Sequence, residues 1–332
     1  IIFIPYPPKM ISRTMTIIFL VIASYIAAIF GLILNAVRKI DLIYIRSSFL
    51  SMGFLTIRAL ARKTTVKIPA ITEDEFLSDN IAKTFIGKLA QISDRLALAK
   101  ARRVAVNSML LYYELVKRRS FKHKDSPLEL PPGINAQLIE KVKRQLPKKK
   151  PQSTINVGFI GTLSWWQGVD NLVKAITLLN KKGFNLKLTI IGDGSLRHSI
   201  EHLCKSLGIQ YEITGFLPHE EALKYLGMLD IMVLPSRRIS TTESNIPIKV
   251  IEAWALGTPV IVTKHRIFLY KQIKDHEHVI YCEPNPQSIA EAILKLITNN
   301  KVKNKLQKNG PKLAKTFDYK KIAERILRTV GS

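Results

Sequence analysis

Short apolar runs alternate with stretches of helical periodicity through the second half of the chain. The runs predict strands, and the stretches between them predict helices. Expected strands cover 155–160, 186–191, 211–214, 231–234, 259–263 and 279–282, and expected helices cover 170–179, 196–207, 220–227, 248–256 and 288–298. Strands built almost wholly of Val, Ile and Leu are typical of a parallel sheet with helices on both faces. The pattern therefore predicts a doubly wound α/β domain, in which ligands bind at the carboxyl ends of the strands.

The first half repeats this alternation less regularly. Candidate strands cover 1–4, 42–45, 66–68 and 103–107, and helical stretches cover 49–61 and 81–99. The pattern breaks at Pro131-Pro132-Gly133, and a basic linker is expected at 141–150. We therefore expect two α/β domains, an N-terminal one at 1–150 and a C-terminal one at 151–332.

Residues 14–37 carry no charged side chain, which satisfies the length rule for a membrane-spanning helix. A strand expected at 41–46 begins almost at once, and that leaves little chain between a bilayer and a sheet. Three placements stay open: a span, a helix partly sunk in the membrane interface, and a buried helix of the domain. The interfacial placement fits best. The chain begins with Ile1 and shows no signal-peptide pattern, so we expect its natural start to be missing.

Charge narrows the range of partners. The 332 residues include 51 Lys and Arg against 25 Asp and Glu, a net charge of +26. Such an excess attracts nucleic acid, anionic lipid or phosphorylated substrates. No basic strand motif rich in aromatic residues is present, so no nucleic-acid partner is expected. Two cysteines exclude a disulfide scaffold and a zinc cluster.

Three glycines mark the expected ligand edge. Gly161, Gly192 and Gly215 each follow a predicted strand, where glycine lets the backbone approach a ligand and a helix N-terminus favours phosphate. Ordinary turn chemistry explains any one of them equally well. Three in succession favour a nucleotide site. No G-x-G-x-x-G follows the first strand of either half and no G-x-x-x-x-G-K-[ST] is present, which disfavours a classical dinucleotide fold and a P-loop enzyme.

The segment 235–263, PSRRISTTESNIPIKVIEAWALGTPVIVT, carries the most specific chemistry. Two carboxylates, Glu243 and Glu252, flank a helix start at Pro247. An ionised carboxylate accepts hydrogen bonds from a sugar diol, and free N–H groups at a helix start can hold a diphosphate.

This segment resembles the donor-binding region of the retaining glycosyltransferases of family four, which have the GT-B fold. NVGFIGTLSWWQGVDNLVKAI and LTIIGDGSLRHSIE are similar to two further motifs of that family, in the same order. The resemblance implies two doubly wound Rossmann-like domains facing a cleft. It also implies that Glu252 holds the ribose, that Glu243 contacts the sugar hydroxyls, and that loop 161–168 lies under the diphosphate. The backbone that would adjoin the sugar belongs to Ser244, Asn245 and Ile246.

Three departures from the family pattern bear on function. Eight residues rather than seven separate Glu243 from Glu252. Thr162 and Gln167 stand where the family usually has an Arg and a Lys that face the diphosphate, and we expect Lys249 to replace part of that charge. The family's first strand, with its glycine-rich loop, has no match, so the N-terminal domain is expected to be incomplete.

The sequence thus predicts a cytoplasmic, peripherally membrane-associated enzyme. It would move a sugar from a nucleoside-diphosphate sugar to a lipid-linked or saccharide acceptor, with retention, at an anionic membrane surface. No metal or other cofactor is expected. Two alternatives stay open: a nucleotide-sugar 2-epimerase on the same fold, and a catalytically silent membrane-bound partner that binds a sugar nucleotide.

Overall fold

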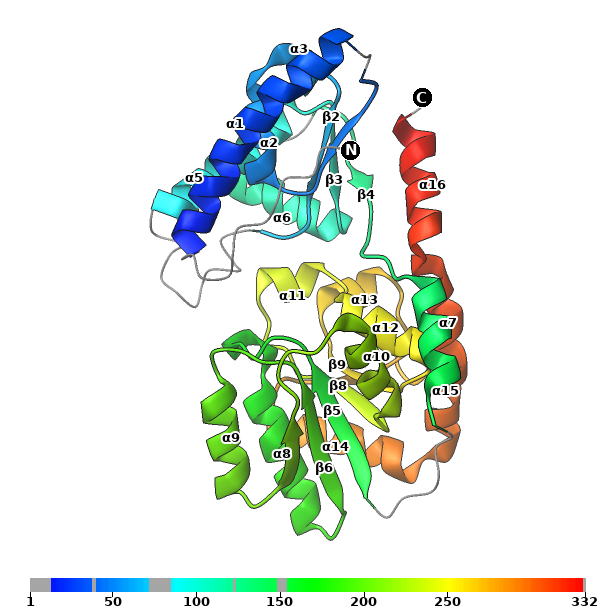
Figure 1. Ribbon diagram of the computed structural model, residues 1–332. Coiled ribbons are helices and arrows are strands. Elements are labelled where there is room, and N and C mark those ends of the chain that lie inside the picture. Colours follow the sequence, from blue (N-terminus) through cyan, green and yellow to red (C-terminus); the bar gives the residue numbers. More distant parts are fainter. Residues whose placement is uncertain (1–12, 38–39, 72–84, 122–123, 148–153, 331–332) are drawn as a thin grey trace. The chain divides into compact units, whose positions relative to one another are not determined.

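A computed structural model describes residues 13–37, 40–71, 85–121, 124–147 and 154–330. The chain divides into two compact units, Ile1–Pro131 and Pro132–Ser332 (Figure 1). The boundary expected at 150 lies beyond helix α7 (Ala136–Gln145), which packs on helices of the second unit. The segment expected as a basic linker from Lys141 is therefore helical as far as Gln145, because Ile139 and Val142 form a buried stripe one turn apart.

The second unit is built on a parallel sheet of six strands in the order β10-β9-β8-β5-β6-β7. The strands are β5 (Ile155–Ile160), β6 (Leu186–Ile191), β7 (Gln210–Ile213), β8 (Ile231–Leu234), β9 (Val260–Thr263) and β10 (Ile280–Cys282). Chain order reverses between β5 and β8, which are hydrogen-bonded neighbours. A switch of this kind opens a ligand crevice at the carboxyl ends of the two strands.

Helices cover both faces of this sheet. They are η3 (Trp165–Gln167), α8 (Val169–Lys181), α9 (Arg197–Ser206), α10 (His219–Met228), α11 (Ser240–Ser244), α12 (Ile248–Leu256), α13 (Arg266–Tyr270), α14 (Pro286–Thr298), α15 (Asn300–Ala314), η4 (Lys315–Phe317) and α16 (Tyr319–Val330). Helices α12 and α15 pack together, and Gly310 lies against Trp254. Trp254 is 1% exposed and donates its ring N–H to the His278 carbonyl at 2.9 Å. This packing fixes α12, which carries the predicted site residues.

The first unit contains a parallel four-stranded sheet in the order β1-β2-β3-β4. Its elements are α1 (Arg13–Val37), β1 (Ile43–Ile45), α2 (Ser48–Thr56), α3 (Arg58–Ala61), β2 (Thr64–Ile68), α5 (Phe85–Lys100), β3 (Arg103–Val106), α6 (Met109–Arg119) and β4 (Leu128–Glu129). The predicted strand at 1–4 lies outside the described residues. A buried ion pair, Arg119 to Asp94 at 2.7 Å, ties α6 to α5.

Helix α1 has two unlike faces. Small residues line the buried face, where Ser24 Oγ accepts the Gly53 N–H of α2 at 3.1 Å and Ala28 is fully buried. The opposite face is apolar and exposed, at 53% for Ile26 and 58% for Ile29. Within α1, residues Ile17–Val37 have a mean hydropathy of 2.8 and could span a membrane by length and composition, and a third of that stretch is buried in the protein. One face of α1 thus packs on the protein, mainly on α2.

Candidate active site

The three predicted glycines lie side by side at the carboxyl edge of the second unit. Gly161 donates its N–H to the Ile191 carbonyl at 2.9 Å, and Gly192 bridges to Gly215. Gly192 has a φ of +140°, and a Cβ there would overlap the Gly161 carbonyl oxygen. Only glycine permits this approach, because a side chain would clash with backbone that cannot yield. The ends of β5, β6 and β7 therefore form one continuous glycine-lined edge.

The loop from β5 to α8 is anchored to the end of β8. The Arg237 backbone N–H donates to the Trp166 carbonyl at 2.7 Å, and the Arg237 guanidinium pairs with Asp170 at 2.9 Å and bonds the Trp165 carbonyl. Gly168 turns at a φ of +67° directly against Pro235. These contacts hold the loop over the switch point between β5 and β8. Thr162 lies exposed on that loop.

Lys249 reaches this loop from the first turn of α12. Its Nζ lies 4.4 Å from the centre of the Phe159 ring and donates to Gln167 Oε1 at 3.2 Å. The same Nζ lies 2.5 Å from the place that a Cβ on Gly161 would take. Burial lowers the pKa of Lys249 to about 7, against the attraction of Glu252. The structure thus brings three predicted residues, Gly161, Gln167 and Lys249, to one point.

Glu252 lies one turn further along α12 and is 5% exposed. Its Oε1 bonds His219 Nε2 at 2.7 Å, from the first turn of α10. Burial raises the pKa of this carboxyl, and His219 and Lys249 oppose the rise. The sequence did not predict this pairing, because nothing in the segment around His219 indicates a partner 33 residues away. The bond places His219 at the candidate ribose site.

Glu243 lies in α11, a short helix of polar residues that precedes α12. Its Oε1 lies 3.1 Å from His265 Nδ1, and its Oε2 accepts a hydrogen bond from the Arg266 backbone N–H at 2.8 Å. Burial raises the pKa of this carboxyl, but these two bonds, together with the attraction of His265 and Arg238, outweigh burial and hold the pKa below its usual value. Glu243 thus ties α11 to the start of α13, and its contact with sugar hydroxyls stays a prediction.

The three residues after Glu243 complete the loop. Ser244 Oγ donates to the Ser240 carbonyl at 2.6 Å, and Asn245 Nδ2 donates to the Thr241 carbonyl at 3.4 Å. Ile246 is 4% exposed. These side chains turn back into the protein, and only their backbone groups fit the predicted role beside the sugar.

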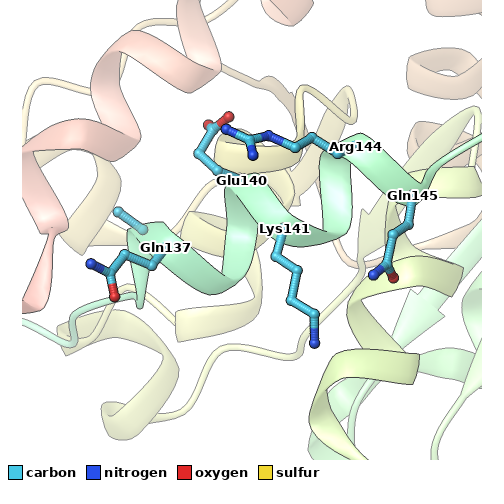
Figure 2. Close-up of a pocket in the computed structure, with 6 residues that line it drawn as sticks. Gln137, Glu140, Lys141, Arg144 and Gln145 are labelled. Carbon is cyan, nitrogen blue, oxygen red and sulfur yellow. The ribbon is translucent and has the colours of Figure 1, made fainter.

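A separate hollow of about 520 Å³ runs along α7 (Figure 2). Its lining residues are Ala136, Gln137, Glu140, Lys141, Arg144 and Gln145. None of the predicted site residues lines it, so it is a different surface from the strand edge. Among the described residues, no group of three or more His, Cys, Asp or Glu side chains could hold a metal ion.

Comparison with known proteins identifies the family of this chain. The family model for Glycosyl transferases group 1 matches residues 139–313, more than half of the chain. An uncharacterized glycosyltransferase of Methanocaldococcus jannaschii is 31% identical over 144 residues, which are 42% of this chain and 35% of that protein. Alignments to four such curated relatives cover between 35% and 54% of their lengths, so the chain spans about half of them or less.

Solved structures share the fold. Sucrose-phosphate synthase from Thermosynechococcus elongatus has a TM-score of 0.74 at 20% identity, over 98% of this chain and 80% of that chain. The Anabaena protein HepE, in complex with UDP and glucose, has a TM-score of 0.68 at 18% identity, over 91% and 80%. The fold class is therefore GT-B, with Rossmann-like α/β units. Since the family match covers more than half of its residues and includes the whole candidate site, the chain belongs to the group 1 glycosyltransferases.

Proposed function

We propose that this protein transfers a sugar from a nucleoside-diphosphate sugar to an acceptor hydroxyl, with retention of the anomeric configuration. One observation carries the proposal. A glycine-lined strand edge, a buried carboxylate at Glu252 and a half-buried lysine at Lys249 meet at the switch point of one parallel sheet. This set of groups suits a ligand that combines vicinal hydroxyls with phosphate. Membership of the family supports the same reaction.

Each group has a part in that reaction. Glu252 would accept hydrogen bonds from the two ribose hydroxyls, and loop 161–168 would lie beneath the diphosphate. Backbone groups of Ser244, Asn245 and Ile246 would adjoin the sugar, with Glu243 bracing their loop through α13. The difficult step is departure of the nucleoside diphosphate. Fixed N–H groups and positive charge at the strand edge would stabilise the charge that grows on it. The proposal needs no metal and no organic cofactor.

The acceptor proposed here is lipid-linked, and the enzyme would work on the cytoplasmic side of a membrane. Helix α1 supports this proposal, since it exposes an apolar face while its other face packs on α2. Residues 1–150 carry 26 basic and 10 acidic side chains, so an anionic leaflet would attract this part of the chain. Peripheral attachment would bring the site to acceptors that do not leave the membrane.

The test begins with a thermal-shift screen of the full chain against UDP-, GDP-, ADP- and dTDP-sugars. A ligand at 100 times its Kd stabilises a protein by about 2.7 kcal/mol, which the screen detects easily. The donor that binds is then incubated with lipid-linked and free saccharide acceptors, and the anomeric configuration of the product is read by NMR. Retained configuration supports the proposal. An inverted product contradicts retention, an epimerised sugar nucleotide without acceptor indicates an epimerase, and binding without turnover indicates a silent partner.

A further inference from the structure

A diphosphate at this strand edge lacks its expected cations. Thr162 and Gln167 are uncharged, although they occupy the two places where the family resemblance led us to expect Arg and Lys. A nucleoside diphosphate gains negative charge as the sugar leaves, and in a partly buried site that charge must meet positive partners. The positive partner of the diphosphate must therefore be another cation of this chain.

Three arginines near the edge are already paired. Arg197 bonds Asp193 at 3.0 Å and Glu201 at 2.8 Å, and Arg237 pairs with Asp170. The third, Arg238, contacts Glu283 at 2.7 Å and Glu243 at 3.6 Å. A guanidinium neutralised by one or two carboxylates offers little net charge to a ligand. Each of these arginines thus has a structural task that competes with binding a diphosphate.

Lys249 differs from them. Within the described part of the chain it forms no ion pair, and its ammonium has one hydrogen-bond acceptor, Gln167 Oε1 at 3.2 Å. An ammonium has three donors, so two remain for a ligand. The group rests on the Phe159 ring and against Gly161, at the carboxyl end of β5. Lys249 therefore lies at the predicted diphosphate position with most of its bonding capacity unused.

From this arrangement we propose that Lys249 binds the diphosphate and stabilises it as the leaving group, in place of the cations absent at Thr162 and Gln167. The inference rests on the proposed function. In the transfer, the bond from the anomeric carbon to the phosphate oxygen breaks and its electron pair stays on that oxygen. A new bond forms between the anomeric carbon and the acceptor oxygen, whose proton passes to the departing phosphate. Lys249 stays protonated and donates to the phosphate throughout.

The surroundings of Lys249 also argue against a purely structural role for it. A buried ammonium with one weak partner stabilises a fold poorly, because desolvation costs more than one hydrogen bond returns. The folded pKa of about 7 lies below the usual 10.5, so between these values the unfolded chain binds a proton that the folded chain does not. Stability should therefore rise with pH across that window, and Lys249→Met should abolish this rise without lowering the unfolding midpoint.

The test compares Lys249→Met and Lys249→Arg with wild type in the full chain, and uses Lys174→Met, an exposed change on α8, as the matched control. Calorimetry measures the binding of UDP, GDP, ADP and dTDP, and of the nucleoside of whichever base binds. We expect Lys249→Met to lower the affinity for the nucleoside diphosphate at least tenfold and to leave the affinity for the nucleoside unchanged. We also expect it to reduce turnover at least tenfold. Lys249→Arg should retain part of the binding, and Lys174→Met all of it.

A pH series adds a second readout. Diphosphate binding to wild type should weaken as pH rises and Lys249 loses its proton, and the Met variant should lose that dependence. Among the described residues, Glu252 is the charged group that acts on Lys249, and His219 pairs with that carboxylate. Equal diphosphate affinity and turnover in Lys249→Met and wild type would overturn the inference. Failure of wild type to bind any nucleoside diphosphate would instead overturn the proposed function.

Discussion

Lys249 and Glu252 lie one helical turn apart on α12, and burial shifts their pKa values in opposite directions. Burial lowers the pKa of the lysine to about 7 and raises that of the carboxyl, so each charge is costly where it lies. Their mutual attraction and the His219 bond offset part of this cost. Charges held at a cost to stability are typical of sites selected for chemistry. Substitutions at these two positions should therefore affect binding more than folding.

The first prediction concerns Glu252→Gln. A hydrogen bond to a charged acceptor contributes about 1.5–3 kcal/mol, so affinity for a nucleoside diphosphate should fall roughly 10- to 150-fold. The pKa of Glu252 is raised in the folded protein, so its ionisation at a pH above the usual pKa of a glutamate reduces stability. The Gln variant, whose side chain is neutral, should therefore be at least as stable as wild type at pH 7. Calorimetry and thermal unfolding measure the two effects. An unchanged Kd for the nucleoside diphosphate would remove Glu252 from the ribose site.

The second prediction uses two glycines with positive φ. Gly161→Ala places a methyl group 2.5 Å from Lys249 Nζ and strains a backbone at +136°, whereas Gly183→Ala strains a backbone at +89° with nothing within 4 Å. Both variants should lower the unfolding midpoint, because the left-handed region disfavours a side chain. Only Gly161→Ala should also weaken diphosphate binding, by about tenfold or more in calorimetry. Equal affinity for the diphosphate in the two variants would show that Gly161 does not lie at the diphosphate site.

The residues of the candidate site were named from two kinds of signal. Gly161, Gly192 and Gly215 follow expected strands, and Glu252 lies near an expected helix start. Gln167 and Lys249 were named from departures from the family pattern, and the roles of all these residues stay predictions. His219 and His265 were missed because their partners, Glu252 and Glu243, lie 33 and 22 residues away in sequence. A contact at that separation depends on how helices pack, and one sequence carries no local signal of it.

At the scale of elements, prediction worked where a strand is buried on both sides. The runs at 155–160, 186–191 and 231–234 agree with β5, β6 and β8 in both bounds, because runs that are mostly apolar are buried in the core along most of their length. Short elements with mixed composition were missed. Helix α11 consists of STTES, which is not among the expected helices, and it forms through local bonds such as that from Ser244 Oγ to the Ser240 carbonyl.

The third prediction tests the packing of α1 on α2. A Cβ on Gly53 would overlap the Ser24 carbonyl of the α1 backbone, which cannot move aside, whereas a Cβ on Gly31 would lie 3.2 Å from a ring carbon of Phe54, which can. Gly53→Ala should therefore cost about 1–3 kcal/mol of unfolding free energy, a typical value for overpacking. Gly31→Ala should be close to neutral. Urea unfolding measures both, and equal stability of the two variants would contradict the close contact of the helices.

At the scale of the whole molecule, two features act together: a net charge of +26 and the exposed apolar face of α1. The sequence alone left α1 open between a span, an interfacial helix and a buried helix. Apolar composition cannot settle this, because all of its faces are apolar. The two faces of α1 differ in their packing. Ser24, Ala28 and Gly31 face the protein, whereas Ile22, Ile26 and Ile29 are exposed. This arrangement supports the interfacial placement, which stays a prediction.

The last prediction is that the full chain binds vesicles through this face. Anionic vesicles should carry the protein upward in a flotation gradient at low salt, and high salt should weaken attachment only in part, because screening removes the charge attraction and leaves apolar burial. Ile26→Glu with Ile29→Glu should abolish the part that resists salt. Leu207→Glu, at an exposed apolar position of the second unit, should leave it unchanged. Sedimentation without vesicles reports whether the same face joins two copies instead. If wild type fails to float with vesicles of any charge, or if the Ile26 and Ile29 double variant floats as wild type does in high salt, α1 is not the membrane contact.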